Sequence, residues 1–97
     1  MRTIIWTDLA LSDYHENIDY LLQRWSEKEA LSFVKDVEII LFDLKKGNIE
    51  FKESSYKSIK ECVIRKQVSL YYRLIDKNKI ELLRFWNNYQ DDKELRF

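Results

Sequence analysis

The residues best suited to chemistry are cationic and aromatic side chains in the second half of the chain. Fixed positive charge binds phosphate or carboxylate groups without strict geometry, and aromatic rings stack on bases or cations. The candidate target-binding residues are Lys60, Arg65, Lys66, Tyr71, Arg73, Arg84, Tyr89 and Gln90. The alternative interpretation is structural, because lysines also protect edge strands from aggregation and arginine stems also pack flat on aromatic rings.

The charges of the chain balance overall but are unevenly distributed. Its 97 residues include 17 basic and 17 acidic side chains. Residues 1–48 carry six basic and nine acidic groups, a net charge of −3, whereas residues 49–97 carry eleven and eight, a net charge of +3. Between Lys52 and Arg84 nine basic residues outnumber four acidic ones. This excess predicts either a modest basic surface that suits an acidic partner or an ordinary solvated face.

Composition excludes several classes of site. Cys62, His15 and Gly47 are each the only residue of their type. The chain therefore cannot contain an intrachain disulfide, a CxxC motif, a zinc finger or a glycine-rich phosphate loop. We interpret the carboxylates of residues 91–94 as solvated or as facing a partner protein, and we expect no metal and no cofactor. A lone cysteine favours a reducing compartment. Because no apolar run is long enough for a membrane span or a signal peptide, we expect a cytoplasmic protein without membrane contact.

The start of the chain predicts one strand and one amphipathic helix. Residues 3–7 (TIIWT) are β-branched or aromatic, which is typical of a buried strand. Thr7 or Asp8 then caps a helix whose apolar positions recur every three or four residues from Ala10 to Trp25. We place Asp13 among the polar residues on the opposite side of this helix, and we expect the apolar stripe to pack against the rest of the protein.

A second helix follows at once and completes a hairpin. Residues 26–29 (SEKE) form a capping box, and Trp25 and Ala30 are placed to form the apolar staple beside it. The apolar stripe continues from Ala30 to Leu44, and Gly47 is suited to end the helix in a left-handed conformation. We therefore predict two antiparallel helices.

The second half of the chain predicts three strands. Residues 48–58 mix polar and aromatic types without a period and are interpreted as a loop. Residues 59–66, 68–76 and 79–86 are rich in β-branched and aromatic types and predict an antiparallel meander. Residues 87–97 form a polar tail that ends in a short helix or an edge strand.

Together these elements predict a single α+β domain over residues 1–97. Its N-terminal strand and α-helical hairpin pack on one face of a four-stranded, mostly antiparallel sheet. The other sheet face is then expected to be open, basic and aromatic. Its predicted occupants are Arg65, Ser69, Tyr71, Arg73, Arg84 and Trp86.

The order of elements and three local strings resemble the RelE/ParE toxins of bacterial type II toxin–antitoxin systems. The strings are IIWTDLALSDYHENIDYL, CVIRKQVSLYYRLID and IELLRFWNNYQDDKEL, and the resemblance extends from Ile4 to Leu95. It implies a growth-inhibiting toxin with a role in plasmid stabilization, neutralised by a cognate antitoxin. DNA gyrase, or the ribosome with its mRNA, is the implied target, and a homodimer is a further expected partner state.

The resemblance also separates two branches of this family. Members that cut mRNA in the ribosome use lysines and arginines of the central strands, and Lys60 lies where one of these lysines is expected. Cys62 and Ser69 lie where a second lysine and the key arginine would be, and Tyr89 lies where an arginine is common. These departures favour the ParE-like branch, associated with poisoning of DNA gyrase, and no catalytic residue is assigned. The alternatives are a RelE-like ribosome-dependent endoribonuclease and a non-toxic interaction protein on the same fold.

Overall fold

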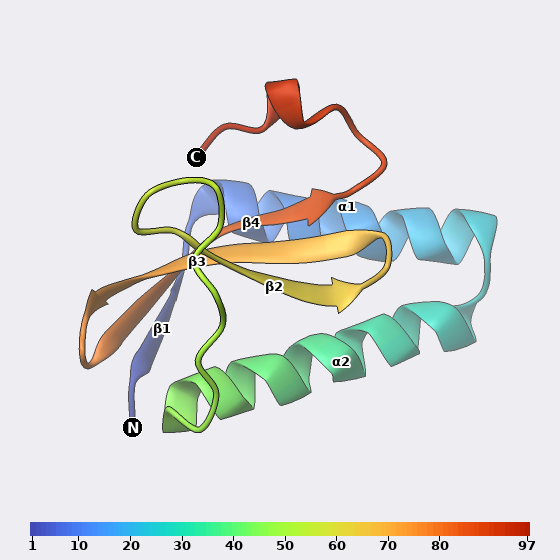
Figure 1. Cartoon of the computed structure of the whole chain (residues 1–97). Coiled ribbons are helices and arrows are strands. Elements are labelled where there is room, and N and C mark those ends of the chain that lie inside the picture. Colours follow the sequence, from blue (N-terminus) through green and yellow to red (C-terminus); the bar gives the residue numbers. More distant parts are fainter.

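The structure is a computed structural model that describes residues 1–97. Its elements follow the predicted order of strand, helical hairpin and meander (Figure 1). They are β1 (Thr3–Trp6), α1 (Asp8–Arg24), α2 (Glu27–Lys46), β2 (Lys60–Arg65), β3 (Val68–Asp76), β4 (Lys79–Asn87) and a short 3₁₀ helix, η1 (Asp92–Glu94). The predicted α+β fold is therefore confirmed, and the tail contains a short helix rather than an edge strand.

The four strands form one mixed sheet in the order β1-β4-β3-β2. β2, β3 and β4 are an antiparallel meander, whereas β1 lies parallel to β4. β1 is short and pairs only from Thr3 opposite Lys79 to Trp6 opposite Leu82. Beyond Leu82, the outer edge of β4 has no strand neighbour. Another part of the chain must therefore satisfy its backbone groups.

Both helices pack on one face of the sheet, with the main core between the layers. Phe33 of α2, Tyr72 of β3 and Phe85 of β4 are among its largest fully buried side chains. Tyr14 of α1 reaches across the layers and contacts Trp6, Phe33 and Phe85, with ring centroids 5.2, 5.8 and 5.5 Å away. None of the helices is long and apolar enough to cross a membrane.

The helix boundaries follow the caps predicted from the sequence. The Thr7 side chain accepts a hydrogen bond from the Ala10 N–H, and the Ser26 hydroxyl accepts one from the Glu29 N–H at 3.1 Å. Gly47 ends α2 with a φ of 77°, a left-handed conformation that glycine adopts without strain. The capping box is only half formed, because the Glu29 carboxylate accepts a hydrogen bond from Arg65.

Two expectations about the hairpin are wrong. Trp25 is 70% exposed, so it does not act as an apolar staple against Ala30. Asp13 lies on the buried side of α1 and not opposite the apolar stripe. Its carboxylate accepts hydrogen bonds from Arg84 and from the Phe85 N–H, because this is where β4 lacks a strand neighbour.

The other sheet face is covered and not open as predicted. In Figure 1 the segment between α2 and β2 crosses in front of the sheet, and the tail after β4 arches over it. Tyr71, Leu83, Trp86 and Leu95 form a second buried cluster there, with Tyr56 and Ile59 packed against it. Phe97 contacts Tyr56 and Tyr71 with ring centroids 5.0 and 5.5 Å away. Ser69 is buried as well.

Candidate functional site

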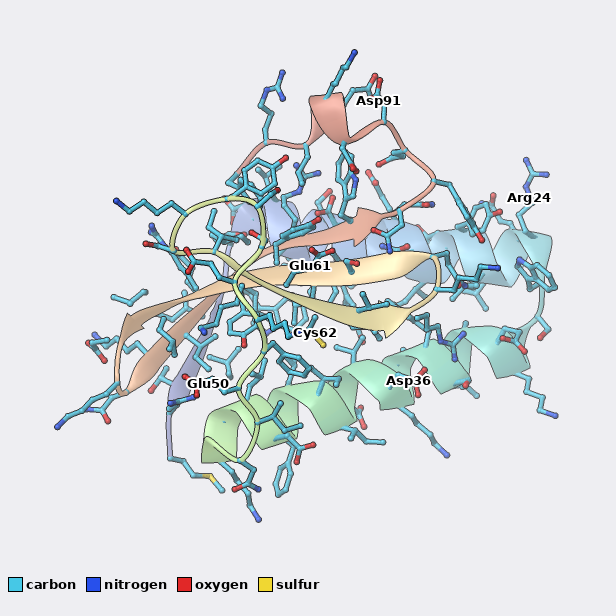
Figure 2. The ribbon with its side chains drawn as sticks, viewed as in Figure 1. Arg24, Asp36, Glu50, Glu61, Cys62 and Asp91 are labelled. Atoms are coloured by element: carbon cyan, nitrogen blue, oxygen red, sulfur yellow. The ribbon has the colours of Figure 1, made fainter.

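Arg65 is the first candidate residue, and its guanidinium is fully engaged by α2. Its Nε donates to Asp36 at 2.8 Å, its Nη2 to the Ser32 hydroxyl at 2.6 Å and its Nη1 to Glu29 at 3.4 Å. The guanidinium carbon also lies 6.0 Å from the centre of the Phe33 ring. Figure 2 labels Asp36 on α2 below the sheet. Arg65 therefore links β2 to α2.

Arg84 is held in the same way by α1. Its Nε and Nη2 donate to the Asp13 carboxylate at 2.6 and 3.0 Å, and its Nη1 donates to the Arg96 carbonyl at 2.7 Å. Its guanidinium carbon lies 5.1 Å from the centre of the Trp86 ring. Arg84 and Trp86 are both nearly buried, so within this chain the pair packs together and does not present an open stacking surface.

Two further cations of the strands, Arg73 and Lys60, also have partners within the chain but lie closer to solvent. Arg73 donates through Nε to Glu81 at 2.6 Å while its own side chain stays 52% exposed. The Lys60 Nζ donates to the Phe51 carbonyl at 3.1 Å. All three arginines of the strands thus have carboxylate partners.

Two of the three positions at which the nuclease pattern needs further cations, Cys62 and Ser69, are buried, whereas the third, Tyr89, is exposed. Cys62 faces the helices, as Figure 2 shows on the α2 side of β2, and burial together with the neighbouring Glu61 raises the pKa of its thiol to about 11. The Ser69 hydroxyl accepts a hydrogen bond from Asn88 at 3.0 Å. The Tyr71 hydroxyl donates to Glu61 at 3.2 Å, and burial and this carboxylate raise the pKa of Tyr71. Both tyrosines of the central strand, Tyr71 and Tyr72, are therefore buried.

Lys66, Tyr89 and Gln90 are the exposed candidate residues without a carboxylate partner, whereas the exposed Arg73 is paired with Glu81. They lie at the end of the sheet where the β2–β3 turn meets the segment after β4, because the Asn88 N–H donates to the Gln67 carbonyl at 2.7 Å and the Asn88 amide to the Lys66 carbonyl at 3.3 Å. Tyr89 is 74% exposed. The structure thus brings three of the eight predicted residues together and disperses the others.

A pocket of about 250 Å³ opens at this end of the sheet, between its strands and the second half of α1. We call it the end pocket. Its nine lining residues are Asn17, Tyr20, Leu21, Trp25, Phe33, Gln67, Val68, Asn87 and Tyr89. None of the nine carries a charge, although 35% of the residues of the chain do. The end pocket can bind an apolar or aromatic group and offer it amide hydrogen bonds.

A second hollow continues the end pocket along α1. The two share Asn17, Tyr20 and Asn87, and the second also contains Glu16 and Gln90. One groove therefore follows α1 along its side toward β4. An apolar anchor at one end and a polar channel beside it are typical of a surface that binds a peptide segment of another protein.

The sequence pattern missed Tyr20 and Trp25 as site residues. It assigned Trp25 to the packed stripe of α1, and it gave Tyr20 no role. An exposed tryptophan beside exposed tyrosines is the composition of an interaction hot spot. No sequence signal joins these two residues to Tyr89, because they meet only when the end of α1 lies against the end of β4.

The fold is similar to those of several solved bacterial toxins. The chromosomal ParDE system of P. aeruginosa matches with a TM-score of 0.73 and 19% identity over 90% of this chain and 96% of that one. The E. coli DinJ–YafQ complex matches with a TM-score of 0.62 and 12% identity over 92% and 96%. The YoeB dimer of Staphylococcus aureus matches with a TM-score of 0.60 and 20% identity over 88% and 94%. These likenesses define the fold.

The sequence itself gives the family. The model of the ParE toxin of the type II toxin–antitoxin system parDE matches residues 4–91. The chain therefore belongs to the ParE toxin family, and the predicted resemblance is confirmed. A search of curated proteins gives no significant match. No group of three or more His, Cys, Asp or Glu side chains is placed to hold a metal ion.

Proposed function

We propose that this chain arrests growth by binding DNA gyrase, and that a cognate antitoxin neutralises it in the cytoplasm. On this proposal the toxin acts through a protein–protein contact and does not cleave RNA. The observation that carries the proposal is the pairing of the strand arginines: Arg65, Arg73 and Arg84 each form a salt bridge with a carboxylate of the same chain.

These salt bridges bear directly on phosphodiester cleavage. Cleavage of RNA without a metal needs cations that stabilise charge developing on the phosphate, and a proton donor and acceptor beside them. A cation already neutralised by a carboxylate contributes little to a new anion. Cys62 and Ser69 add buried, uncharged groups where further cations would be required. The loss of one such contributor commonly costs about a hundredfold or more in rate.

The end pocket is the surface that we propose for the contact with the target. Its exposed rings, Tyr20, Trp25 and Tyr89, can enclose an apolar side chain of a partner, while Asn87 and Gln67 supply amide groups beside it. Tryptophan and tyrosine provide a large share of binding energy at protein interfaces. Lys66 at the adjacent turn adds a cation beside this uncharged pocket.

Support for an antitoxin partner comes from proteins of the same fold. Solved structures similar to this chain include the DinJ–YafQ toxin–antitoxin complex of E. coli and the YoeB–YefM complex of Staphylococcus aureus. The family to which the chain belongs takes its name from the parDE toxin–antitoxin system. We therefore propose that a small protein encoded beside this gene binds the chain.

The test is inhibition of purified gyrase in a supercoiling assay, together with growth after induced expression. We expect the unaltered chain to inhibit supercoiling and arrest growth, and the Trp25→Ala/Tyr89→Ala variant to need about tenfold more protein for the same inhibition. Ile75→Ala, which changes an exposed apolar residue at the far end of β3, is the matched control and should behave as the unaltered chain.

Cleavage of mRNA is the result that would oppose this proposal. Sequencing of mRNA 5′ ends after induction would reveal new cleavage sites within translated codons if the chain were a ribosome-dependent nuclease. Such sites, together with unaffected gyrase, would refute the gyrase proposal. Growth that continues normally with a folded chain would instead favour a non-toxic interaction protein.

A further inference from the structure

A group of cations lies at the end of the sheet opposite the end pocket. There the start of β1, the β3–β4 turn and the end of α2 come together, on the left side of Figure 1. Arg2 joins them, because its backbone N–H donates to the Lys45 carbonyl at 2.9 Å and its Nε donates to the Lys77 carbonyl at 3.2 Å. We call this region the basic end. Its cations are Arg2, Lys45, Lys46, Lys60, Lys77 and Lys79, and they outnumber its carboxylates, Asp43, Glu50 and Asp76.

A small pocket opens within the basic end and measures about 100 Å³. We call it the Arg2 pocket. Charged and hydroxyl-bearing side chains line it together with Gly47, namely Arg2, Glu50, Lys60 and Tyr72. Pockets that enclose a whole small molecule measure roughly 300–1,000 Å³. The Arg2 pocket therefore admits only a small polar group.

The two cations of this pocket keep their charge and most of their donors. Neither Arg2 nor Lys60 forms a salt bridge. The Arg2 guanidinium donates to the carbonyls of Lys77 and Leu44 at 3.2 and 3.4 Å, and the Lys60 Nζ donates to the Phe51 carbonyl at 3.1 Å. These carbonyls hold the side chains in place without cancelling their charge. A guanidinium has five N–H donors and an ammonium has three, so both cations retain donors for a ligand.

The Tyr72 hydroxyl and the Glu50 carboxylate complete the polar lining. Burial raises the pKa of the Tyr72 hydroxyl, so at neutral pH it is an uncharged donor. The charge of Arg2 lowers this pKa and that of Glu50 raises it, which places the hydroxyl near both charges. Glu50 is exposed, forms no salt bridge and is labelled near the end of α2 in Figure 2. Its carboxylate is the one group of the lining that repels an anion.

We propose that the Arg2 pocket binds one phosphate of a nucleic-acid backbone, and that the other lysines of the basic end contact neighbouring phosphates. Arg2, Lys60 and Tyr72 supply donors from three separate parts of the chain, which suits an anion whose acceptor oxygens point in several directions. The pocket has room for a single group, and the lysines beside it remain free to meet further phosphates of the same strand. Such contacts fix a nucleic acid in place without reading its sequence. This inference goes beyond the proposed function and does not depend on gyrase.

The Arg2 pocket differs from the nuclease pattern. Of the positions in that pattern, Lys60 lies here, whereas Ser69 and Tyr89 lie toward the opposite end of the sheet beside Asn88. Arg2, which contributes the largest number of donors, has no place in the pattern. We therefore propose binding of the phosphate and not its cleavage.

The first experiment measures binding of the full-length chain to a fluorescein-labelled DNA duplex of about 20 base pairs by fluorescence anisotropy, between about 50 and 200 mM NaCl. We expect Arg2→Gln/Lys60→Gln to weaken binding by about tenfold or more and to flatten its salt dependence. The matched control is Lys28→Gln/Lys35→Gln, which removes the same charge from exposed positions of α2 outside the basic end. It should weaken binding less than about threefold.

A gain of affinity provides a test that does not depend on the structural role of Arg2. Glu50→Gln removes the repelling carboxylate and should tighten DNA binding by about threefold or more. The control Glu38→Gln removes an exposed carboxylate of α2 and should change it less than about 1.5-fold. Lys60→Gln alone should weaken binding in the opposite sense. Circular dichroism and urea unfolding establish that each variant is folded.

The second experiment locates the site with inorganic phosphate as the probe. ¹⁵N–¹H spectra of the full-length chain are recorded while phosphate replaces chloride at constant ionic strength. We expect saturable shifts at the backbone N–H groups of Gly47, Ile49 and Lys60, which line the Arg2 pocket, and none at Gln67 and Tyr89 of the end pocket.

The outcomes separate this inference from the proposed function. Equal losses of DNA affinity in the Arg2/Lys60 variant and in its control, or no gain in Glu50→Gln, would refute the site. Saturable phosphate shifts without DNA binding would identify a free anion as the ligand and refute the nucleic acid. Tighter binding to phosphatidylserine vesicles or to polyglutamate than to DNA would identify a membrane or an acidic protein instead. DNA binding through this pocket with unaffected gyrase would support the inference and refute the proposed function.

Discussion

Arg84→Met should destabilise the protein far more than a typical change of a charged residue. Arg84 and Asp13 are both nearly buried, with side chains 12% and 11% exposed. In the variant, the Asp13 carboxylate loses both hydrogen bonds from the guanidinium and keeps only the one from the Phe85 N–H, which is 3.1 Å long. The carboxylate is only 11% exposed, so it is left as a largely uncompensated charge.

The expected magnitude follows from this geometry. Breaking a buried ion pair by removing one partner costs about 3–5 kcal/mol. A chain of this length has a free energy of unfolding of roughly 5–15 kcal/mol. With a denaturant slope of about 1.5 kcal/mol per molar urea, a loss of 3 kcal/mol lowers the unfolding midpoint by about 2 M. The slope itself should not change, because the same surface is exposed on unfolding.

Two further variants test whether Asp13 holds a buried charge. Arg73→Met removes the half-exposed partner of Glu81 and should cost less than about 1 kcal/mol. The double variant Asp13→Asn/Arg84→Met should recover more than about 1 kcal/mol relative to Arg84→Met, because the amide oxygen still accepts from the Phe85 N–H and no charge is buried. Equal losses for Arg84→Met and Arg73→Met, or a double variant no more stable than the single one, would show that Asp13 does not hold a buried charge.

Three other predictions concern stability. Burial raises the pKa of the Cys62 thiol from 9.0 to about 11, so folding favours the neutral thiol. The free energy of unfolding that this shift contributes is fully present below pH 9 and falls by up to about 2.7 kcal/mol as the pH rises through 11. Urea unfolding of a Cys62→Ala variant should not show this fall. Ser26→Ala should lower the free energy of unfolding by about 0.5–2 kcal/mol because it removes the cap of α2, and Phe33→Ala should lower it by about 3–5 kcal/mol because it empties a core position. Equally small effects of both variants would show that the hairpin is packed differently. Gly47→Ala should lower the stability measured by thermal unfolding by about 1 kcal/mol, because alanine is strained at the left-handed φ of 77°. A new Cβ meets no clash, since the nearest atom lies 3.7 Å away, so a loss above about 3 kcal/mol would contradict this reasoning.

The elements were predictable because their signals are local. Thr7, Ser26 and Gly47 mark helix ends by interactions within a few residues, and the alternating apolar residues of the meander fix which side of each strand is buried. The role of Asp13 was not predictable. Its partner Arg84 is 71 positions away, and helical periodicity alone places a carboxylate among the polar residues.

The covered sheet face was not predictable for a related reason. The tail is polar, and only two of its last residues, Leu95 and Phe97, are apolar, so no period identifies it as a packed segment. Its position depends on long-range contacts of Phe97 with Tyr56 and Tyr71. The end pocket likewise exists only when the ends of α1 and β4 meet. Sites made by such tertiary contacts lack a pattern in the sequence.

Arg65 and Arg84 hold the two helices in place, and this structural role bears on the proposed function. Arg65 ties β2 to α2, and Arg84 ties β4 to α1. Each guanidinium is fixed by several hydrogen bonds, which a lysine could not reproduce. If Arg65 or Arg84 left its carboxylates to contact a phosphate, it would leave uncompensated charges beside the core and loosen a helix. The structural role of these two arginines therefore supports our proposal that the chain acts through its exposed surfaces and not as a nuclease.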